Sequence, residues 1–297
     1  MANVLNRLKF APFYLVSLIP LRILYLFADI GFVVIFYVFR YRRKVVRDNI
    51  TGSFPEKSDR ELIQIERAFY KHFCDQVFEN MKFLTISPQN AKKRFVVKNP
   101  ELIQRYYDQQ KSVISYTAHL GNWEWLAALP FYVKHQMTAF YQPQTSSYFD
   151  QIIKLVRERF GAITIQSKRG YKSLMEFAKK DVLTISLIIG DQGPHPKSSR
   201  YWTMFLNRET GFMYGADRIA QKSNQVVVFP AITKPKRGYY EVEFIVLQEE
   251  LTNVRKGEII EKYAKALENA IYAAPHLWLW THRRWKRQRR EEEVMGR

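Results

Sequence analysis

Residues 112–126, SVISYTAHLGNWEWL, limit the possible folds more than any other segment of the chain. The apolar run 113–116 is typical of a buried strand, and residues 123–129 are expected to begin a helix. Gly121 and Asn122 between them supply turn and helix-capping character. The segment therefore predicts an open α/β sheet, in which His119 follows the carboxyl end of a strand, the edge where ligands bind.

Strand and helix patterns alternate along the rest of the chain. Strands are predicted at residues 95–97, 113–117, 138–141, 162–165, 183–189, 202–205, 225–232 and 239–246, with Gly238 marking the last hairpin. Helices are predicted at residues 62–84, 122–131, 147–160, 171–179, 215–221 and 258–272. This alternation predicts one α/β domain with a mixed, largely parallel sheet covered by helices.

His119 and Glu124 are a candidate catalytic pair within the first turn. An imidazole paired with a carboxylate is a minimal general base, because the acid fixes the tautomer while the other nitrogen takes a proton from a hydroxyl. A histidine with an acid five residues away also occurs by chance. The pair therefore gains its weight from its context.

That context is a resemblance to a known family. The pattern of His, four residues and an acid on a strand-to-helix turn resembles the signature of glycerolipid and lipid A acyltransferases. The form HLGNWE looks specifically like the late acyltransferases of lipid A biosynthesis, the lauroyl and myristoyl transferases. Four further blocks match in order: YRRKVVRDNITGSFPEKS (41–58), SKRG (167–170), GDQG (190–193) and PHLWLWTHRRWK (275–286). A glycerol-phosphate acyltransferase would have Pro-Glu-Gly where this chain has Asp-Gln-Gly, which argues against glycerol phosphate as the acceptor.

The resemblance implies a glycerolipid-acyltransferase-like fold and an O-acyltransferase. The donor would be an acyl thioester on acyl carrier protein, and the acceptor a free hydroxyl of a lipid A precursor. His119 would remove the proton of that hydroxyl, Glu124 would orient His119, and no acyl-enzyme would form. The expected substrate-binding residues are Asn122, Lys168, Arg169, Asp191 and Gln192.

Several of these residues have a physical argument of their own. Asp191 and Gln192 follow another predicted strand, so we expect them to converge on the same crevice as His119, or else to cap the loop. Arg169 is expected to hold a substrate phosphate or an oxyanion, with a helix-start cation as the alternative. Lys197 to Arg200 are expected to contact phosphate.

The N-terminus is apolar from residue 10 to residue 39. Its least interrupted part, residues 23–39, would be about 25 Å long as a helix, slightly short of a bilayer core of about 30 Å. The basic cluster 40–47 follows directly and favours the cytoplasmic face of a membrane. We expect residues 1–47 to anchor a catalytic domain, residues 48–297, at the cell inner membrane, with a buried core helix as the alternative. Asp29 in this stretch needs a partner, and Arg22 is the candidate.

The chain has a formal net charge of +19. Such a charge suits nucleic acid, but it equally suits a membrane surface and a phosphorylated glycolipid, and the apolar N-terminus favours the latter. The single cysteine, Cys74, excludes an internal disulfide, and the scattered histidines indicate neither a metal site nor a cofactor. Two alternatives stay open: an acyltransferase for another membrane lipid, and an inactive basic protein that binds membranes or nucleic acid.

Overall fold

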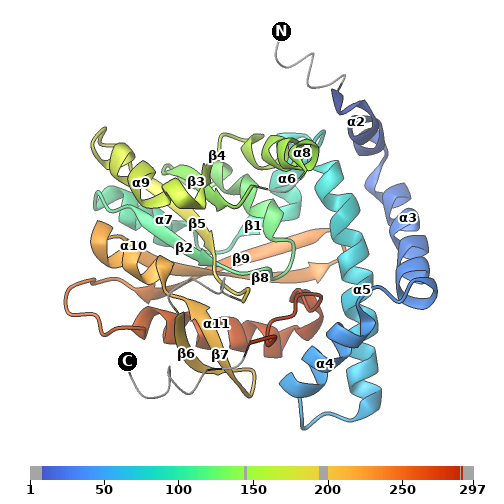
Figure 1. The fold of residues 1–297 in the computed structure, drawn as a ribbon. Coiled ribbons are helices and arrows are strands. Elements are labelled where there is room, and N and C mark those ends of the chain that lie inside the picture. The colour runs from blue at the N-terminus through green and yellow to red at the C-terminus, as the bar shows by residue number, and fades with distance from the viewer. Residues whose placement is uncertain (1–8, 144–145, 194–199, 288, 290–297) are drawn as a thin grey trace.

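Seven strands form one sheet in the computed structural model, which describes residues 9–143, 146–193, 200–287 and 289 (Figure 1). The strand order is β1-β9-β8-β2-β5-β3-β4, and each neighbouring pair is parallel except β8 with β9. The strands are β1 (Phe95–Val97), β2 (Val113–Thr117), β3 (Gln136–Tyr141), β4 (Ile163–Gln166), β5 (Thr184–Ile189), β8 (Val226–Lys236) and β9 (Tyr239–Gln248). The predicted mixed, largely parallel sheet is confirmed.

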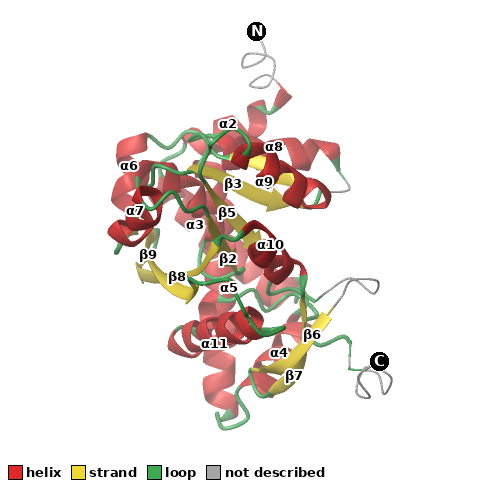
Figure 2. Cartoon of the chain, turned by 90° about the vertical axis from the view of Figure 1, so that its left-hand side faces the viewer, coloured by secondary structure: helices red, strands yellow, loops and turns green. Residues whose placement is uncertain are grey.

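Helices cover both faces of the sheet (Figure 2). One face packs against α6 (Pro88–Arg94), α7 (Pro100–Asp108), the 3₁₀ helix η2 (Trp123–Phe131) and α8 (Ser147–Glu158). The other face packs against α9 (Gly170–Ala178), α10 (Gly215–Ser223) and α11 (Glu258–Ala273). Because successive strand residues point to opposite faces, Val113 lies in one apolar core while Ile114 and Tyr116 lie in the other. Strand β2, buried at every position, therefore forms part of both cores.

A separate hairpin, β6 (Arg200–Phe205) with β7 (Arg208–Met213), extends the core on the α11 side. Its turn residues Leu206 and Asn207 both have positive φ, as a tight type I′ hairpin turn requires. Phe205 and Phe212 pack edge to face, with ring centroids 5.4 Å apart. The sequence predicted β6 but not β7.

The N-terminal segment packs along one long helix, α5 (Asp59–Lys82). A capping box of Ser58 and Glu61 starts α5 by satisfying two backbone N–H groups. The helices α2 (Ala11–Leu18), α3 (Leu21–Val33) and α4 (Arg43–Ser53) lie against it, and the π-helical turn η1 (Val34–Val38) extends α3 (Figure 1). The apolar stretch is thus docked on the protein rather than projecting freely from it.

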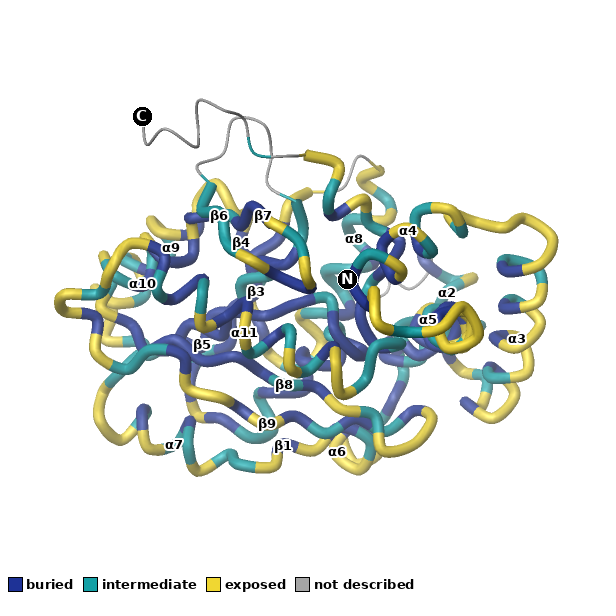
Figure 3. The backbone as a smooth tube through the Cα atoms, turned by 90° about the horizontal axis from the view of Figure 1, so that it is seen from below, coloured by how far each residue is buried: buried dark blue, intermediate teal, exposed yellow. Residues whose placement is uncertain are grey.

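One side of helix α3 stays exposed despite this docking (Figure 3). Its inner side chains, among them Leu24, Ala28 and Phe32, are buried. The outer face exposes Ile23, Leu26, Phe27, Ile30 and Val33. Among the described residues, Leu21–Val38 is the one helical segment whose length and composition suit a membrane crossing. An exposed apolar face of this kind is typical of contact with lipid or a partner.

Asp29 of α3 does not pair with Arg22, contrary to the sequence prediction. Its carboxylate accepts a hydrogen bond of 2.7 Å from Nη2 of Arg237, in the β8–β9 hairpin. The same guanidinium also binds Asp75 of α5. Arg237 is thus fixed between two carboxylates, and this pairing ties α3 to the sheet.

Candidate active site

His119 and Asp191 meet because their strands are neighbours in register. Strands β2 and β5 are parallel, with Thr117 opposite Ile189, and each of the two residues lies two positions beyond its strand. The backbone N–H of Gly190 donates to the Thr117 carbonyl at 3.1 Å, which continues the ladder into the loop. The carboxyl edge of the parallel sheet therefore carries both side chains, as in other α/β sites.

Asp191 holds His119 through two hydrogen bonds and accepts a third from Trp278. Its Oδ1 lies 2.7 Å from Nδ1 of His119, and its Oδ2 accepts from the His119 backbone N–H at 2.9 Å and from the indole N–H of Trp278 at 2.8 Å. Burial alone would raise the pKa of Asp191, but the His119 imidazole and these hydrogen bonds outweigh it and lower that pKa. Asp191 is therefore a carboxylate, fixed against the imidazole.

This arrangement sets the tautomer of His119. Because the carboxylate accepts at Nδ1, a neutral imidazole carries its proton there and presents Nε2 as an acceptor. The side-chain amide of Gln192 lies 3.2 Å from Nε2 and donates to it. The Trp123 ring packs edge to face on the imidazole at 4.8 Å. A hydroxyl that displaced the Gln192 amide would meet a nitrogen ready to take its proton.

The C-terminal segment fixes the backbone of the His119 loop. Leu279 donates its N–H to the carbonyl of His119 at 3.1 Å, and Gly121 donates to the carbonyl of Leu277 at 2.9 Å. Gly121 has φ +58°, and a Cβ there would lie 2.5 Å from Cγ2 of Ile232, so the turn requires glycine. Sequence reasoning missed Trp278 as a partner of Asp191, although it lies in the closing block 275–286.

Glu124 does not contact His119 in the way that the spacing predicted. Its carboxylate forms a two-pronged ion pair with Arg157 of α8, at 2.6 and 2.8 Å, and accepts from the Trp123 indole at 3.2 Å. Burial would raise the pKa of Glu124, but Arg157 outweighs it and lowers that pKa. The reason is that η2 turns Glu124 toward α8, where the half-buried guanidinium of Arg157 is its partner. The structure gives the contact at Nδ1 to Asp191 instead.

A small apolar cleft of about 30 Å³ lies beside the Glu124–Arg157 ion pair. Its walls come from η2 and from strands β3 and β5, with the Glu124–Arg157 pair and Thr117 among the lining groups. The apolar lining residues are Leu126, Ala127, Met137, Ala139, Phe140, Leu187 and Ile189. The cleft is mostly apolar, but it is far smaller than a ligand pocket of about 300–1,000 Å³.

The remaining predicted substrate residues lie further from His119. Asn122 is fully buried behind the loop, where its amide donates to Oε2 of Glu79 at 2.8 Å. Lys168 and Arg169 are exposed in the 3₁₀ turn η3 (Ser167–Arg169) after β4, two strand positions beyond β5. Lys197, Ser198 and Ser199 lie outside the described residues, while Arg200 begins β6.

Within the described ranges no group of three or more His, Cys, Asp or Glu side chains is arranged to hold a metal ion.

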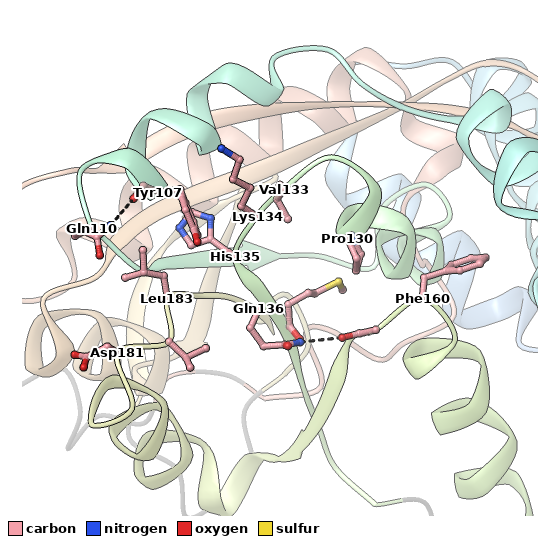
Figure 4. A pocket seen from close by; sticks show the side chains of 13 residues that line it. Tyr107, Gln110, Pro130, Val133, Lys134, His135, Gln136, Phe160, Asp181 and Leu183 are labelled. Atoms are coloured by element: carbon pink, nitrogen blue, oxygen red, sulfur yellow. Dashed lines mark hydrogen bonds between the residues drawn. The ribbon is translucent and has the colours of Figure 1, made fainter.

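A polar cavity of about 500 Å³ is lined by His135, Gln136 and Leu183 among other residues (Figure 4). Because β3 and β5 begin at this cavity, it lies at the opposite edge of the sheet from His119. It is therefore separate from the catalytic edge.

Comparisons with known proteins place the chain in a family. A solved structure, the 1-acyl-sn-glycerophosphate (LPA) acyltransferase PlsC from Thermotoga maritima, is similar at 14% sequence identity and a TM-score of 0.39, over 88% of this chain and 100% of that chain. No curated protein matches the chain. The family model for bacterial lipid A biosynthesis acyltransferases matches residues 5–287. The chain therefore belongs to the bacterial lipid A biosynthesis acyltransferase family, whose members acylate lipids.

Proposed function

We propose that this protein moves a fatty acyl chain from a thioester on acyl carrier protein to a hydroxyl of a lipid A precursor. The family match supports acyl transfer to a lipid. The observation that carries the mechanism is the 2.7 Å contact between His119 Nδ1 and the buried Asp191, which leaves Nε2 as the acceptor. The apolar side chains beside Trp123 and Glu124 are compatible in polarity with an acyl group near His119.

The proposed step is a direct attack. The acceptor hydroxyl displaces the Gln192 amide, gives its proton to Nε2 of His119, and its oxygen attacks the thioester carbonyl carbon. Asp191 stabilises the imidazolium that forms. The tetrahedral intermediate then collapses, the carbon–sulfur bond breaks, and the imidazolium returns the proton to the departing thiolate. No acyl-enzyme forms, and the buried Cys74 thiol, whose pKa burial raises to about 11, has no part in the reaction.

The other residues of the site have supporting roles in this proposal. Glu124 keeps Arg157 paired beside the cleft and steadies Trp123, which packs on the imidazole. Asn122 acts through the loop, since its amide is bonded to Glu79. Lys168 and Arg169 provide positive charge at the same edge of the sheet for an anionic part of the substrate.

A panel of acceptors tests the function. Purified protein in detergent is given the acyl carrier protein thioester with a lipid A precursor, lysophosphatidic acid or a mannosylated phosphatidylinositol, and products are identified by mass spectrometry. We expect transfer to the lipid A precursor. Transfer only to another lipid would show that the proposed acceptor is wrong. Transfer to no lipid, together with salt-sensitive nucleic acid binding, would refute the proposal that the protein is an enzyme.

We further propose that residues 1–47 attach a catalytic domain, residues 48–297, to the cytoplasmic face of the inner membrane. The exposed apolar face of α3 supports contact with the hydrocarbon region. The cluster that follows, RYRRKVVR at 40–47, supports contact with anionic headgroups on the cytoplasmic side. In this arrangement the net positive charge serves lipid rather than nucleic acid.

The attachment leads to a fractionation prediction. Because apolar surface rather than charge alone would hold the protein, we expect it to stay with membranes in 1 M salt, where the Debye length is about 3 Å, and to leave with detergent. Replacing Leu26 and Ile30, which are exposed on α3, by glutamate should increase release by salt. Complete release of the unmodified protein by salt would show that only surface charge holds it.

A further inference from the structure

A cluster of cations lines a small cavity beside the catalytic loop. The cavity measures about 140 Å³, and no carboxylate is among its described lining residues. The ionisable groups that line it are Arg200, His282, Arg283, Arg284, Lys286 and Arg287, and we call this set the C-terminal cation pocket. Arg283, Arg284 and Lys286 around so small a space repel one another, so the pocket favours an anionic occupant.

The pocket shares a wall with the catalytic loop. Gly193, two residues after Asp191, lines it, and a Cβ at Gly193 would lie 3.5 Å from Cε1 of His282 and 3.6 Å from the carbonyl of Arg284. Both Asp191 and His119 are close enough to His282 to influence its pKa, which burial chiefly lowers. An anion in the pocket would therefore lie beside the loop that carries Asp191.

Arg284 is the clearest sign of a built site. Its side chain is only 5% exposed, and one of its nitrogens, Nη2, donates to the Gly211 carbonyl at 2.8 Å while the guanidinium lies over the Phe212 ring. Its Nε is buried without a hydrogen-bond partner in the described part of the chain. Burial lowers the pKa of Arg284 to about 10, although the Asp191 carboxylate acts in the opposite direction. A buried cation with an unsatisfied donor is costly unless a bound anion satisfies it.

A second basic surface leads from the membrane-proximal segment to this pocket. A groove of about 420 Å³ shares Arg283 and Lys286 with the pocket and extends to Lys44 and Asp48 of α4. Helix α4 follows directly after the apolar α3 and η1. A headgroup that enters from the membrane side would therefore pass along cations to reach the pocket.

We propose that the C-terminal cation pocket binds a phosphate group of the membrane-borne acceptor lipid and thereby places the acceptor hydroxyl at His119. This inference rests on the proposed acyl transfer and names the substrate group that the site recognises. Phosphate offers several acceptor oxygens and a full negative charge, which suit a set of arginine and lysine donors. The phosphodiester of the donor's pantetheine arm has the same chemistry, but the groove from α4 favours the acceptor.

The test compares two double variants that remove equal charge. Arg283→Gln/Lys286→Gln alters the exposed wall of the pocket and spares the buried Arg284, whereas Lys179→Gln/Lys180→Gln alters exposed cations that precede β5. We expect the pocket variant to have a KM for the phosphorylated acceptor that is about 10- to 100-fold higher than that of the wild type. The pocket variant should also no longer prefer the phosphorylated acceptor to the dephosphorylated one. The KM for the donor should stay unchanged, and the control variant should resemble the wild type.

A binding measurement separates this inference from the proposed function. At constant ionic strength, inorganic phosphate should raise the Tm of the full-length wild type and of the control variant but not that of the pocket variant. If phosphate does not raise the Tm of the wild type, the pocket does not bind phosphate, even if acyl transfer is found. Equal penalties on both acceptors, or a change confined to the donor KM, would also overturn the inference. A phosphate-dependent Tm without any acyl transfer would keep the pocket as an anion site and refute the enzyme.

Discussion

Replacing His119 by alanine is expected to lower kcat by about 10²–10⁴-fold, because the substitution removes the group that takes the proton of the acceptor hydroxyl. The KM values should change little, since the loop backbone is held by Leu277 and Leu279 and not by the imidazole alone. The measurement is the steady-state rate of acyl transfer by purified protein in detergent, with the acyl carrier protein thioester and a lipid A precursor.

A second histidine provides the control for this prediction. His135 lies at the opposite edge of the sheet, where its ring contacts Tyr107 and the Lys111 carbonyl. His135→Gln should therefore keep turnover near that of the wild type, and the Tm of each variant shows whether it is folded. If a folded His119→Ala protein turns over at a near-normal rate, His119 is not the base.

Much of the fold could be predicted because its signals are local. The apolar run of β2 and the hairpin glycine Gly238 are visible within a few residues of sequence, and both features lie where they were predicted. Strand β7 was missed because its sequence, RETGFM, begins with two charges and contains Gly211, so only pairing with β6 makes it a strand. Tertiary pairing of this kind overrides local propensity.

The partners of charged side chains depend on contacts that a local pattern does not contain. Glu124 lies five residues from His119, yet its partner Arg157 comes from α8 and reaches it only once the helix packs on the sheet. Asp29 similarly finds Arg237 rather than the nearby Arg22. His119 and Asp191 could both be assigned to the carboxyl edge from sequence. The sheet order alone shows that β2 and β5 are adjacent, because β3 and β4 separate them in the chain.

Asp191→Asn tests the tautomer on which the mechanism depends. The Oδ2 position receives two N–H donors, the His119 backbone and the Trp278 indole, so the amide oxygen of asparagine should take that place. Its NH₂ group would then face Nδ1 of His119 and could only donate to it. The ring proton would move to Nε2, which could no longer accept a proton from the hydroxyl. We expect kcat to fall by roughly 10³–10⁴-fold, the size of effect that a wrong tautomer causes in a catalytic triad, with KM nearly unchanged.

Glu124→Gln is the matched comparison, because the spacing of the sequence assigned to Glu124 the role that the structure gives to Asp191. The substitution leaves the half-buried Arg157 without its anion, so its main expected effect is a lower Tm. Its loss in kcat should be at least about tenfold smaller than that of Asp191→Asn. Pairing it with Arg157→Gln should recover part of the Tm, since neither charge is then left alone. If Glu124→Gln abolishes turnover at an unchanged Tm while Asp191→Asn stays active, Glu124 orients the base and the ligand-free geometry rearranges when substrate binds.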